Sequence, residues 1–274
     1  MNARMIATVV VLLLVSAPVM ASFEELELGI AAQAMGGTGV VLQGPGAVMF
    51  NPASIAGADG ISVTAAGRLP FTSMDFATAG LDGVVPVSDS WTGGLSLRHF
   101  GGDLYSEQVA AVTMAGELTG DMSFGLQPMI CAASIADGVS EYGSATSIAF
   151  NVGFQVTMYN RWMVAASVRN PFQARLGESG EHLQRRIDGG VSYQPASGMV
   201  SAVTLSRDWN GLRLHVGQSL PLGPVTLMAG VQSNPVTISG GIGADLGGIG
   251  IEYAVMTHPQ LDLTHQAGVT YAFK

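Results

Sequence analysis

Hydrophobic and polar residues alternate with a period of two along most of this chain. In the run 146–158, every second residue from Ile148 to Met158 is large and apolar, and the residues between them are small or polar. This is the period of a β-strand with one apolar face, and no run convincingly shows the period of a helix. We therefore predict about fourteen strands, which are 61–67, 75–87, 90–101, 105–118, 120–136, 144–158, 161–170, 185–195, 199–208, 211–220, 224–233, 236–246, 248–258 and 263–273.

The connections between these runs alternate in length. Every second connection is a tight turn, from 87–90 near the start to 245–248 near the end. Most of the intervening connections are longer, with 170–185 the longest, although those near Asn210 and Asn234 are also short. Outer-membrane barrels have short periplasmic turns, longer outer loops and an even number of strands. A soluble β-sandwich gives no reason for this alternation.

The last predicted strand has an amphipathic pattern that ends in aromatic residues. Val269, Tyr271 and Phe273 share one face, and only Lys274 follows them. A strand of this kind suits an outer-membrane barrel, whose last strand closes against its first while one face meets lipid. We predict that these three residues form the C-terminal signal for the barrel-assembly machinery. The alternative is the edge strand of a soluble sandwich.

The composition favours a membrane barrel over a soluble protein. The chain is 48% hydrophobic and only 11% charged, whereas soluble domains are about 25% charged. A soluble surface so poor in charge would tend to aggregate, but a lipid-facing surface would not. We therefore predict an all-β, transmembrane antiparallel β-barrel over residues 61–274, surrounded by the lipids of the bacterial cell outer membrane.

The N-terminus has the features of a secretory signal peptide. Arg4 supplies a positive charge, Ile6 to Val15 form a short apolar run, and Val19-Met20-Ala21 provides small residues at a cleavage site. The apolar run is shorter than the roughly 20 residues that a membrane-spanning helix needs. We predict a signal peptide over residues 1–21 and a mature chain that starts near Ser22.

Residues 22–60 differ from the strands that follow them. The stretch is rich in glycine, which permits close backbone approach and positive φ angles, and it contains an Asn-Pro pair that favours a turn. It is too apolar for a disordered tail and too irregular for a barrel strand. We predict a hatch that folds into the barrel lumen, and the alternative is a plain extension beneath the barrel. The hatch residues singled out are Gly36, Gly37, Gly39, Asn51 and Pro52.

Several polar residues interrupt the middle of predicted strands, opposite the apolar faces. A charge on the lipid face is costly, about 2–4 kcal/mol for Arg or Lys at the bilayer midplane. These side chains are therefore predicted to face the lumen, where they could contact a ligand or simply neutralise one another. They are Arg98, Arg169, Asp188, Arg213, His215 and Glu252.

The sequence contains no pattern typical of an enzyme. We find no nucleophile elbow, zinc-protease motif, phosphate-binding loop or calcium loop, and Cys131 is the only cysteine. His258 and His265 flank Asp262, which could be drawn as a metal site or a protease dyad, but a solvated loop explains them better. The net charge of −9 argues against binding to nucleic acid. We predict a non-enzyme with no catalytic residues, metal or cofactor.

Several motifs together resemble a known family. The Gly36–Gly39 and Asn51-Pro52-Ala53 motifs are similar to the N-terminal region of FadL-type fatty acid transporters and of the related PorV and PorQ outer-membrane proteins. Later stretches look like the PorV/PorQ branch, namely Arg169-Asn170-Pro171-Phe172, Asn234-Pro235 with Ser239-Gly240-Gly241-Ile242-Gly243, and Leu263-Thr264-His265 with Tyr271-Ala272-Phe273. The resemblance implies a fourteen-stranded barrel with a lumenal hatch.

Two functions remain open at this point. The first is passive transport of hydrophobic small molecules, such as fatty acids, across the outer membrane. Arginines such as Arg98, Arg169 and Arg213 could then anchor a carboxylate. The second is a PorV-like accessory role in protein secretion or surface assembly, for which the predicted outer loop 170–185 is the only sizeable binding surface. Short loops elsewhere favour transport.

Overall fold

The computed structural model describes residues 23–24, 27–136, 141–177, 180–195 and 197–273. The predicted signal peptide, 1–21, lies outside the described residues. In the described ranges, no helix is long and apolar enough to cross a membrane.

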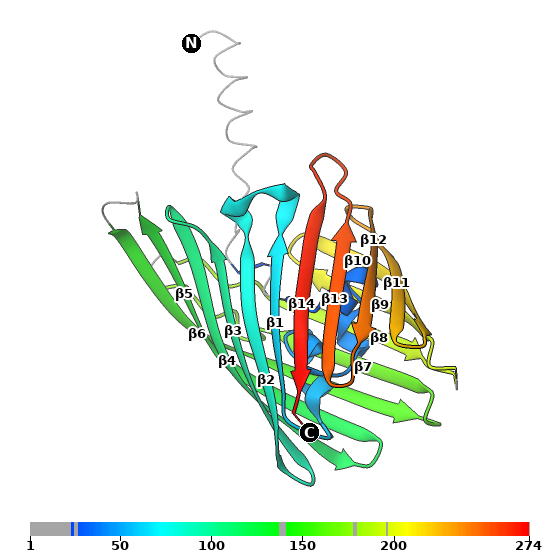
Figure 1. Ribbon diagram of the computed structural model, residues 1–274. Coiled ribbons are helices and arrows are strands. Elements are labelled where there is room, and N and C mark those ends of the chain that lie inside the picture. Colours follow the sequence, from blue (N-terminus) through cyan, green and yellow to red (C-terminus); the bar gives the residue numbers. More distant parts are fainter. Residues whose placement is uncertain (1–22, 25–26, 137–140, 178–179, 196, 274) are drawn as a thin grey trace, which may run out of the picture.

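Fourteen antiparallel strands form a closed barrel in which each strand pairs with its neighbours along the chain (Figure 1). The barrel closes where β1 pairs with β14, with Ser62 opposite Ala272 and Leu69 opposite His265. The predicted fold and strand number are confirmed. The strands are β1 (Ser62–Leu69), β2 (Thr78–Ser88), β3 (Trp91–Gly101), β4 (Tyr105–Thr119), β5 (Met122–Ala136), β6 (Glu141–Met158), β7 (Trp162–Arg169), β8 (Arg186–Tyr193), β9 (Val200–Asp208), β10 (Gly211–Leu222), β11 (Val225–Gln232), β12 (Thr237–Asp245), β13 (Ile249–Met256) and β14 (Thr264–Ala272).

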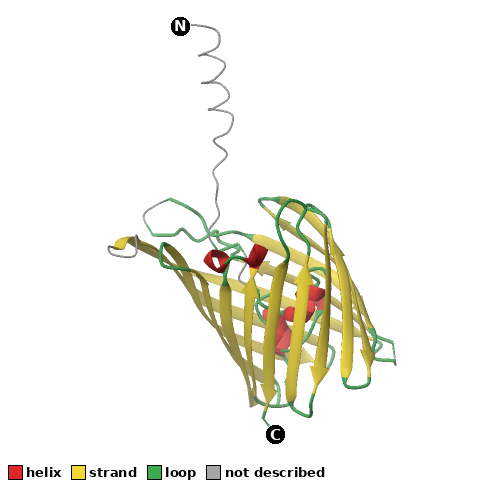
Figure 2. Ribbon diagram, turned by 45° about the horizontal axis from the view of Figure 1, so that its top comes forward, coloured by secondary structure: helices red, strands yellow, loops and turns green. Residues whose placement is uncertain are grey.

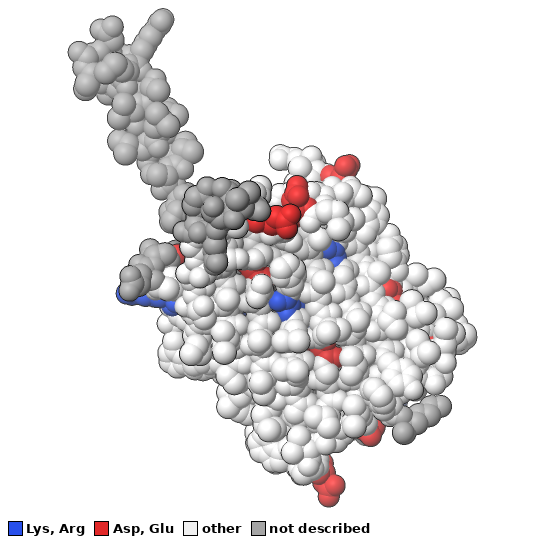
Figure 3. Space-filling model, turned by 60° about the vertical axis from the view of Figure 1, so that its left-hand side comes forward, with Lys and Arg blue, Asp and Glu red and all other residues white. Residues whose placement is uncertain are grey.

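The alternating residues of each strand point to opposite faces of the barrel wall. On β10, Leu212 and Leu214 are 58% and 43% exposed on the outside of the barrel, whereas His215 is 1% exposed inside it. Figure 3 shows an outer surface with few charged groups. In lipid every backbone polar group must be paired within the protein, and closure of the barrel leaves no unpaired strand edge. The chain therefore presents apolar side chains, without free backbone groups, to its surroundings.

The two ends of the barrel differ. The tight turns lie at the end where β14 terminates, which we call the inner end, and most longer loops lie at the opposite, outer end (Figure 1). Aromatic side chains mark the inner end: Trp162 packs on Tyr193 with ring centroids 4.5 Å apart, and Tyr271 contacts Phe273 at 4.7 Å. Such aromatic girdles lie at the interfaces between lipid and water, and short turns are typical of the periplasmic end of an outer-membrane barrel. The turn lengths therefore identify the inner end as the periplasmic one.

Two predicted strand starts are displaced at the outer end. Residues 75–77 precede β2 instead of belonging to it, because the chain forms short 3-10 turns at η4 (Pro70–Thr72) and η5 (Met74–Phe76). Phe71 and Thr72 have positive φ angles of 54° and 57°, which bend the loop and delay the strand. In contrast, β6 starts at 141 instead of 144, because its ladder with β5 continues outward to the pair of Ala136 and Glu141.

The described residues of the N-terminal segment (22–60) lie inside the barrel, where Figure 2 shows its short helices enclosed by strands. These helices are α2 (Ile30–Ala34), η1 (Gly39–Val41), η2 (Pro45–Ala47) and η3 (Pro52–Ile55). The first lies against β11 to β14, η1 against β7 to β9, η2 against β1 and β2, and η3 against β3 to β6. One short segment therefore contacts the wall almost all the way round.

Candidate conduit through the barrel

The N-terminal segment separates two cavities at opposite ends of the barrel. The outer cavity, of about 580 Å³, is lined by ends of strands near the outer rim and by Gln33, Gly37 and Phe50 of the segment. The inner cavity, of about 450 Å³, is lined by the inner ends of β9 to β14 and by residues of the segment that include Ile30 and Met35. Helix α2 thus contributes to both cavities and forms the partition between them.

Glycines in the wall allow the segment to lie directly against the strands. A Cβ atom at Gly217 on β10 would overlap the carbonyl oxygen of Met35, and one at Gly230 on β11 would overlap Gly36. Likewise, a Cβ atom at Gly153 on β6 would overlap the side chain of Asn51. Backbone approach this close is possible only where the wall lacks side chains. The wall is therefore shaped to hold the segment.

Hydrogen bonds fix the turn that follows α2. His215 on β10 binds the carbonyl oxygen of Gly36 through Nδ1 at 2.7 Å and the hydroxyl of Ser206 through Nε2 at 2.7 Å. The hydroxyl of Ser239 on β12 accepts a hydrogen bond from the Gly36 amide at 3.0 Å and donates one to the carbonyl of Ala34 at 2.9 Å. Gly36 and Gly37 have φ angles of 73° and 90°, a backbone conformation that residues other than glycine rarely adopt. The glycines singled out in the sequence thus make a turn held by the wall.

Asn51 fixes the second turn of the segment. Its side chain is fully buried, donates to the carbonyl oxygen of Val40 at 3.0 Å and accepts from the amide of Ala53 at 3.0 Å. The latter bond caps η3, in which Pro52 is the first residue. Gly39 makes room for the Phe50 ring, which a Cβ atom would overlap. Asn51 therefore joins the two halves of the segment.

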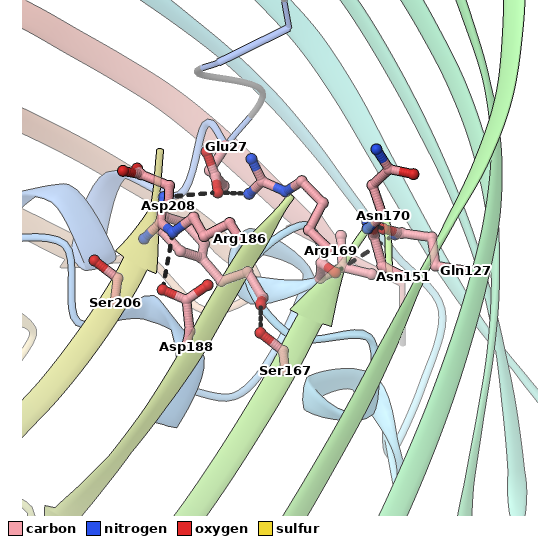
Figure 4. A network of polar contacts seen from close by, with 12 residues as sticks. Glu27, Gln127, Asn151, Ser167, Arg169, Asn170, Arg186, Asp188, Ser206 and Asp208 are labelled. Atoms are coloured by element: carbon pink, nitrogen blue, oxygen red, sulfur yellow. Dashed lines mark hydrogen bonds and ion pairs between the residues drawn. The ribbon is translucent and has the colours of Figure 1, made fainter. Parts of the chain in front are cut away.

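A buried ion-pair cluster ties the start of the segment to the wall (Figure 4). The Glu27 carboxylate pairs with Arg169 on β7 and, at 3.3 Å, with Arg186 on β8. Arg186 also contacts Asp188 at 2.9 Å, and Arg68 on β1 donates to the Glu27 carbonyl oxygen at 3.0 Å. All these side chains are nearly inaccessible, so the loss of one partner would leave a buried charge uncompensated.

The other predicted lumenal arginines are also paired with acids. Arg98 on β3 contacts both carboxylate oxygens of Asp82 on β2 at 2.8 and 2.9 Å. Arg213 contacts Asp208 at 2.8 Å across the outer turn between β9 and β10. Glu252 lies apart from these arginines and lines the inner cavity. The six lumenal candidates therefore do not form one site, since Arg169, Asp188, Arg213 and His215 occur near the outer cavity and Arg98 and Glu252 elsewhere.

Several residues of the conduit were not singled out in the sequence. Glu27, Asp82, Arg186 and Asp208 are partners of predicted residues, but three of the four lie at strand ends or in the irregular segment. Asp82 could have been found from the sequence, because it is a charged residue in the middle of β2, just as Arg98 is on the neighbouring strand β3. Glu27 gave no such signal, because the two arginines that pair with its carboxylate are more than 140 residues away along the chain.

The histidines around the last outer loop do not form a shared site. The His265 side chain binds the Tyr253 hydroxyl at 2.6 Å, whereas His258 accepts backbone hydrogen bonds within its own loop and packs on Phe71. Among the described residues, no group of three or more His, Cys, Asp or Glu side chains is arranged to hold a metal ion. Cys131 is fully buried against the N-terminal segment.

Neither a protein-family model nor a curated protein matches the sequence. Solved structures do resemble the fold. The toluene transporter TbuX of Ralstonia pickettii superposes with a TM-score of 0.68 and 12% identity, covering 91% of this chain and 100% of that one. The toluene transporter TodX of Pseudomonas putida gives a TM-score of 0.69 and 14% identity, covering 91% and 98%. A FadL homologue of Pseudomonas aeruginosa gives 0.66 and 12%, covering 90% and 98%.

These likenesses agree with the features of the chain itself. The apolar exterior, the tight inner turns and the aromatic inner rim are those of a barrel that spans the bacterial outer membrane. Sequence identities this low show a shared fold and do not identify the transported molecule. The protein therefore has the fold of the FadL-type outer-membrane channels.

Proposed function

We propose that this protein is a passive channel for hydrophobic small molecules across the outer membrane, closed in the structure by its own N-terminal segment. The observation that carries the proposal is the pair of cavities, one facing each end of the barrel, with α2 as the partition between them. Each has the volume of a small-molecule site, which is typically about 300–1,000 Å³. A solute that crosses must therefore displace or reshape the segment.

The outer cavity has an apolar entrance. Phe71, Phe76 and Phe100 line it at the outer rim together with Met256. The Phe71 ring lies edge-on to that of Phe76, with centroids 6.3 Å apart. Aromatic rings offer apolar surface with favourable geometry for other rings. Two of the structural neighbours are toluene transporters, and an aromatic cargo would suit such an entrance.

The pairing of charges favours uncharged cargo over a fatty acid anion. Arg186 and Arg213, which line the outer cavity, each contact an acid of the protein. A fatty acid carboxylate that binds Arg213 would lie close to the Asp208 carboxylate, which repels it, whereas an uncharged hydrophobic molecule meets no such repulsion. Fatty acid-like ligands, which the sequence suggests, would therefore meet a carboxylate of the protein at each of these arginines.

Uptake by intact cells tests the proposal. Cells that produce the protein should accumulate radiolabelled toluene faster than cells that lack it, with unchanged entry of labelled sucrose as the control for general leakage. Equal toluene uptake by the two strains would refute transport. Comparison of labelled dodecanoate with dodecanol in the same cells decides the charge preference, and faster dodecanoate uptake that is lost in Arg213→Ala or Arg98→Ala would restore the carboxylate anchor.

The accessory role in secretion remains the alternative prediction. Its predicted surface, the loop 170–185, carries Phe172, which is 74% exposed and packs on Phe150 with ring centroids 4.8 Å apart. Native mass spectrometry of the protein purified in mild detergent separates the two roles. A protein partner in a fixed ratio would favour the accessory role, and a bound small molecule without such a partner would favour transport.

A further inference from the structure

Glu252 occupies an unusual place in the barrel wall. It lies on β13 and its side chain lines the inner cavity. Its cross-strand neighbours are both glycines, Gly243 on β12 and Gly268 on β14. Neither neighbour can carry a partner side chain. The described part of the chain offers the Glu252 carboxylate no hydrogen-bond donor and no basic side chain.

The wall beside this carboxylate has room for a small side chain. A Cβ atom at Gly243 would lie 3.6 Å from Glu252 Cγ and 3.7 Å from Met228 Cε, which is ordinary contact distance. On the other side, the Ile30 side chain of the N-terminal segment covers Gly268. The carboxylate thus faces into the cavity, with the apolar side chains of Met228 and Ile30 nearby.

The inner cavity differs from the outer cavity in its charges, because arginines accompany the acids that line the outer cavity. The described lining of the inner cavity contains Glu252 and Asp245 but no arginine or lysine. Asp245 is occupied by the turn after β12, where its carboxylate accepts from the amides of Gly247 at 2.9 Å and Gly248 at 3.4 Å. Glu252 is therefore the acid in this lining that remains available to a ligand. The rest of the lining is uncharged and includes the apolar Ile30, Met35, Val200 and Met228 as well as several hydroxyl-bearing side chains, among them Thr226 and Thr270.

We propose that the inner cavity binds hydrophobic amines, with the Glu252 carboxylate as the anchor for the ammonium group. A carboxylate at an apolar wall is costly unless a positive partner or donor compensates it. An ammonium with an apolar tail supplies the charge to Glu252 and the tail to the apolar lining. This inference rests on the proposed function, because the inner cavity is one of the two cavities of the proposed channel, and it extends the cargo to a cationic class.

Equilibrium dialysis tests the site on the full mature protein in lipid nanodiscs, with empty nanodiscs subtracted. The probes are hexylamine, hexanol and hexanoate, which share one tail and differ in charge. Hexylamine should bind about tenfold or more tightly than hexanol, since a charge-assisted hydrogen bond contributes this much. Glu252→Gln should abolish the difference. Asp121→Asn, the same change of charge at an exposed inner turn, should preserve it.

A second variant separates charge from space. Gly243→Val should fill part of the cavity beside Glu252 and weaken the binding of both hexylamine and hexanol. Equal binding of hexylamine and hexanol by the unmodified protein would overturn the proposal, as would an amine preference that survives in Glu252→Gln. Because dialysis measures binding alone, failure of toluene uptake would refute transport without touching this site, and loss of amine preference would refute the site without touching transport.

Discussion

At the scale of single residues, Glu27 connects the N-terminal segment to three strands of the wall, β1, β7 and β8. Its carboxylate pairs with Arg169 and Arg186, and its carbonyl accepts from Arg68. Glu27→Gln keeps the shape but removes the charge, so both arginines remain buried with less compensation. Breaking a buried pair in this way costs about 3–5 kcal/mol. We expect faster hydrogen exchange at the amides of residues 30–47.

The matched control for this variant is Asp262→Asn, which neutralises an exposed acid in the loop between β13 and β14. It should leave exchange in the segment unchanged. Unchanged exchange in Glu27→Gln as well would mean that the ion pairs do not hold the segment, and the glycine contacts would then have to account for its attachment alone.

At the scale of elements, the contact of α2 with β10 and β11 depends on glycines in the wall. Gly217→Ala would place a Cβ atom on the carbonyl of Met35, which is backbone and cannot rotate away. We expect a loss of about 1–3 kcal/mol in the free energy of unfolding, measured by urea titration in detergent. Gly83→Ala on β2, where a Cβ atom meets nothing within 4 Å, is the control. Equal stability of the two variants would contradict this close approach.

The aromatic end of β14 is predicted to act in the assembly of the barrel. Phe273 is 51% exposed at the inner rim beside Tyr271, where it meets lipid instead of a packed core. Phe273→Ala should therefore lower the amount of folded barrel in the outer membrane while the protein that does assemble stays stable. The heat-modifiable band on a gel measures this amount. Phe76→Ala, which removes a ring of similar exposure from an outer loop, should assemble normally; a normal yield of Phe273→Ala would argue against the assembly signal.

At the scale of the whole molecule, the sequence predicted the barrel because its pattern is local. Each strand must place apolar residues toward lipid at every second position, as Leu212 and Leu214 do. This pattern can be recognised within one strand, without knowing which strands pair with it. The contacts of the conduit are not local. Arg98 was recognised as a lumenal charge, but its pairing with Asp82, which leaves no free carboxylate anchor, depends on strand register. The partners of Glu27 likewise become visible only when the barrel closes.

Single-channel conductance in planar bilayers tests most directly whether the N-terminal segment closes the barrel. The comparison is between the mature protein and a variant that lacks residues 29–51, which include α2 and the turns held by His215 and Asn51. Circular dichroism must first show that the variant keeps its strands. We predict a clear increase in conductance, because removal of α2 joins the two cavities. Unchanged conductance in a folded variant would contradict the account.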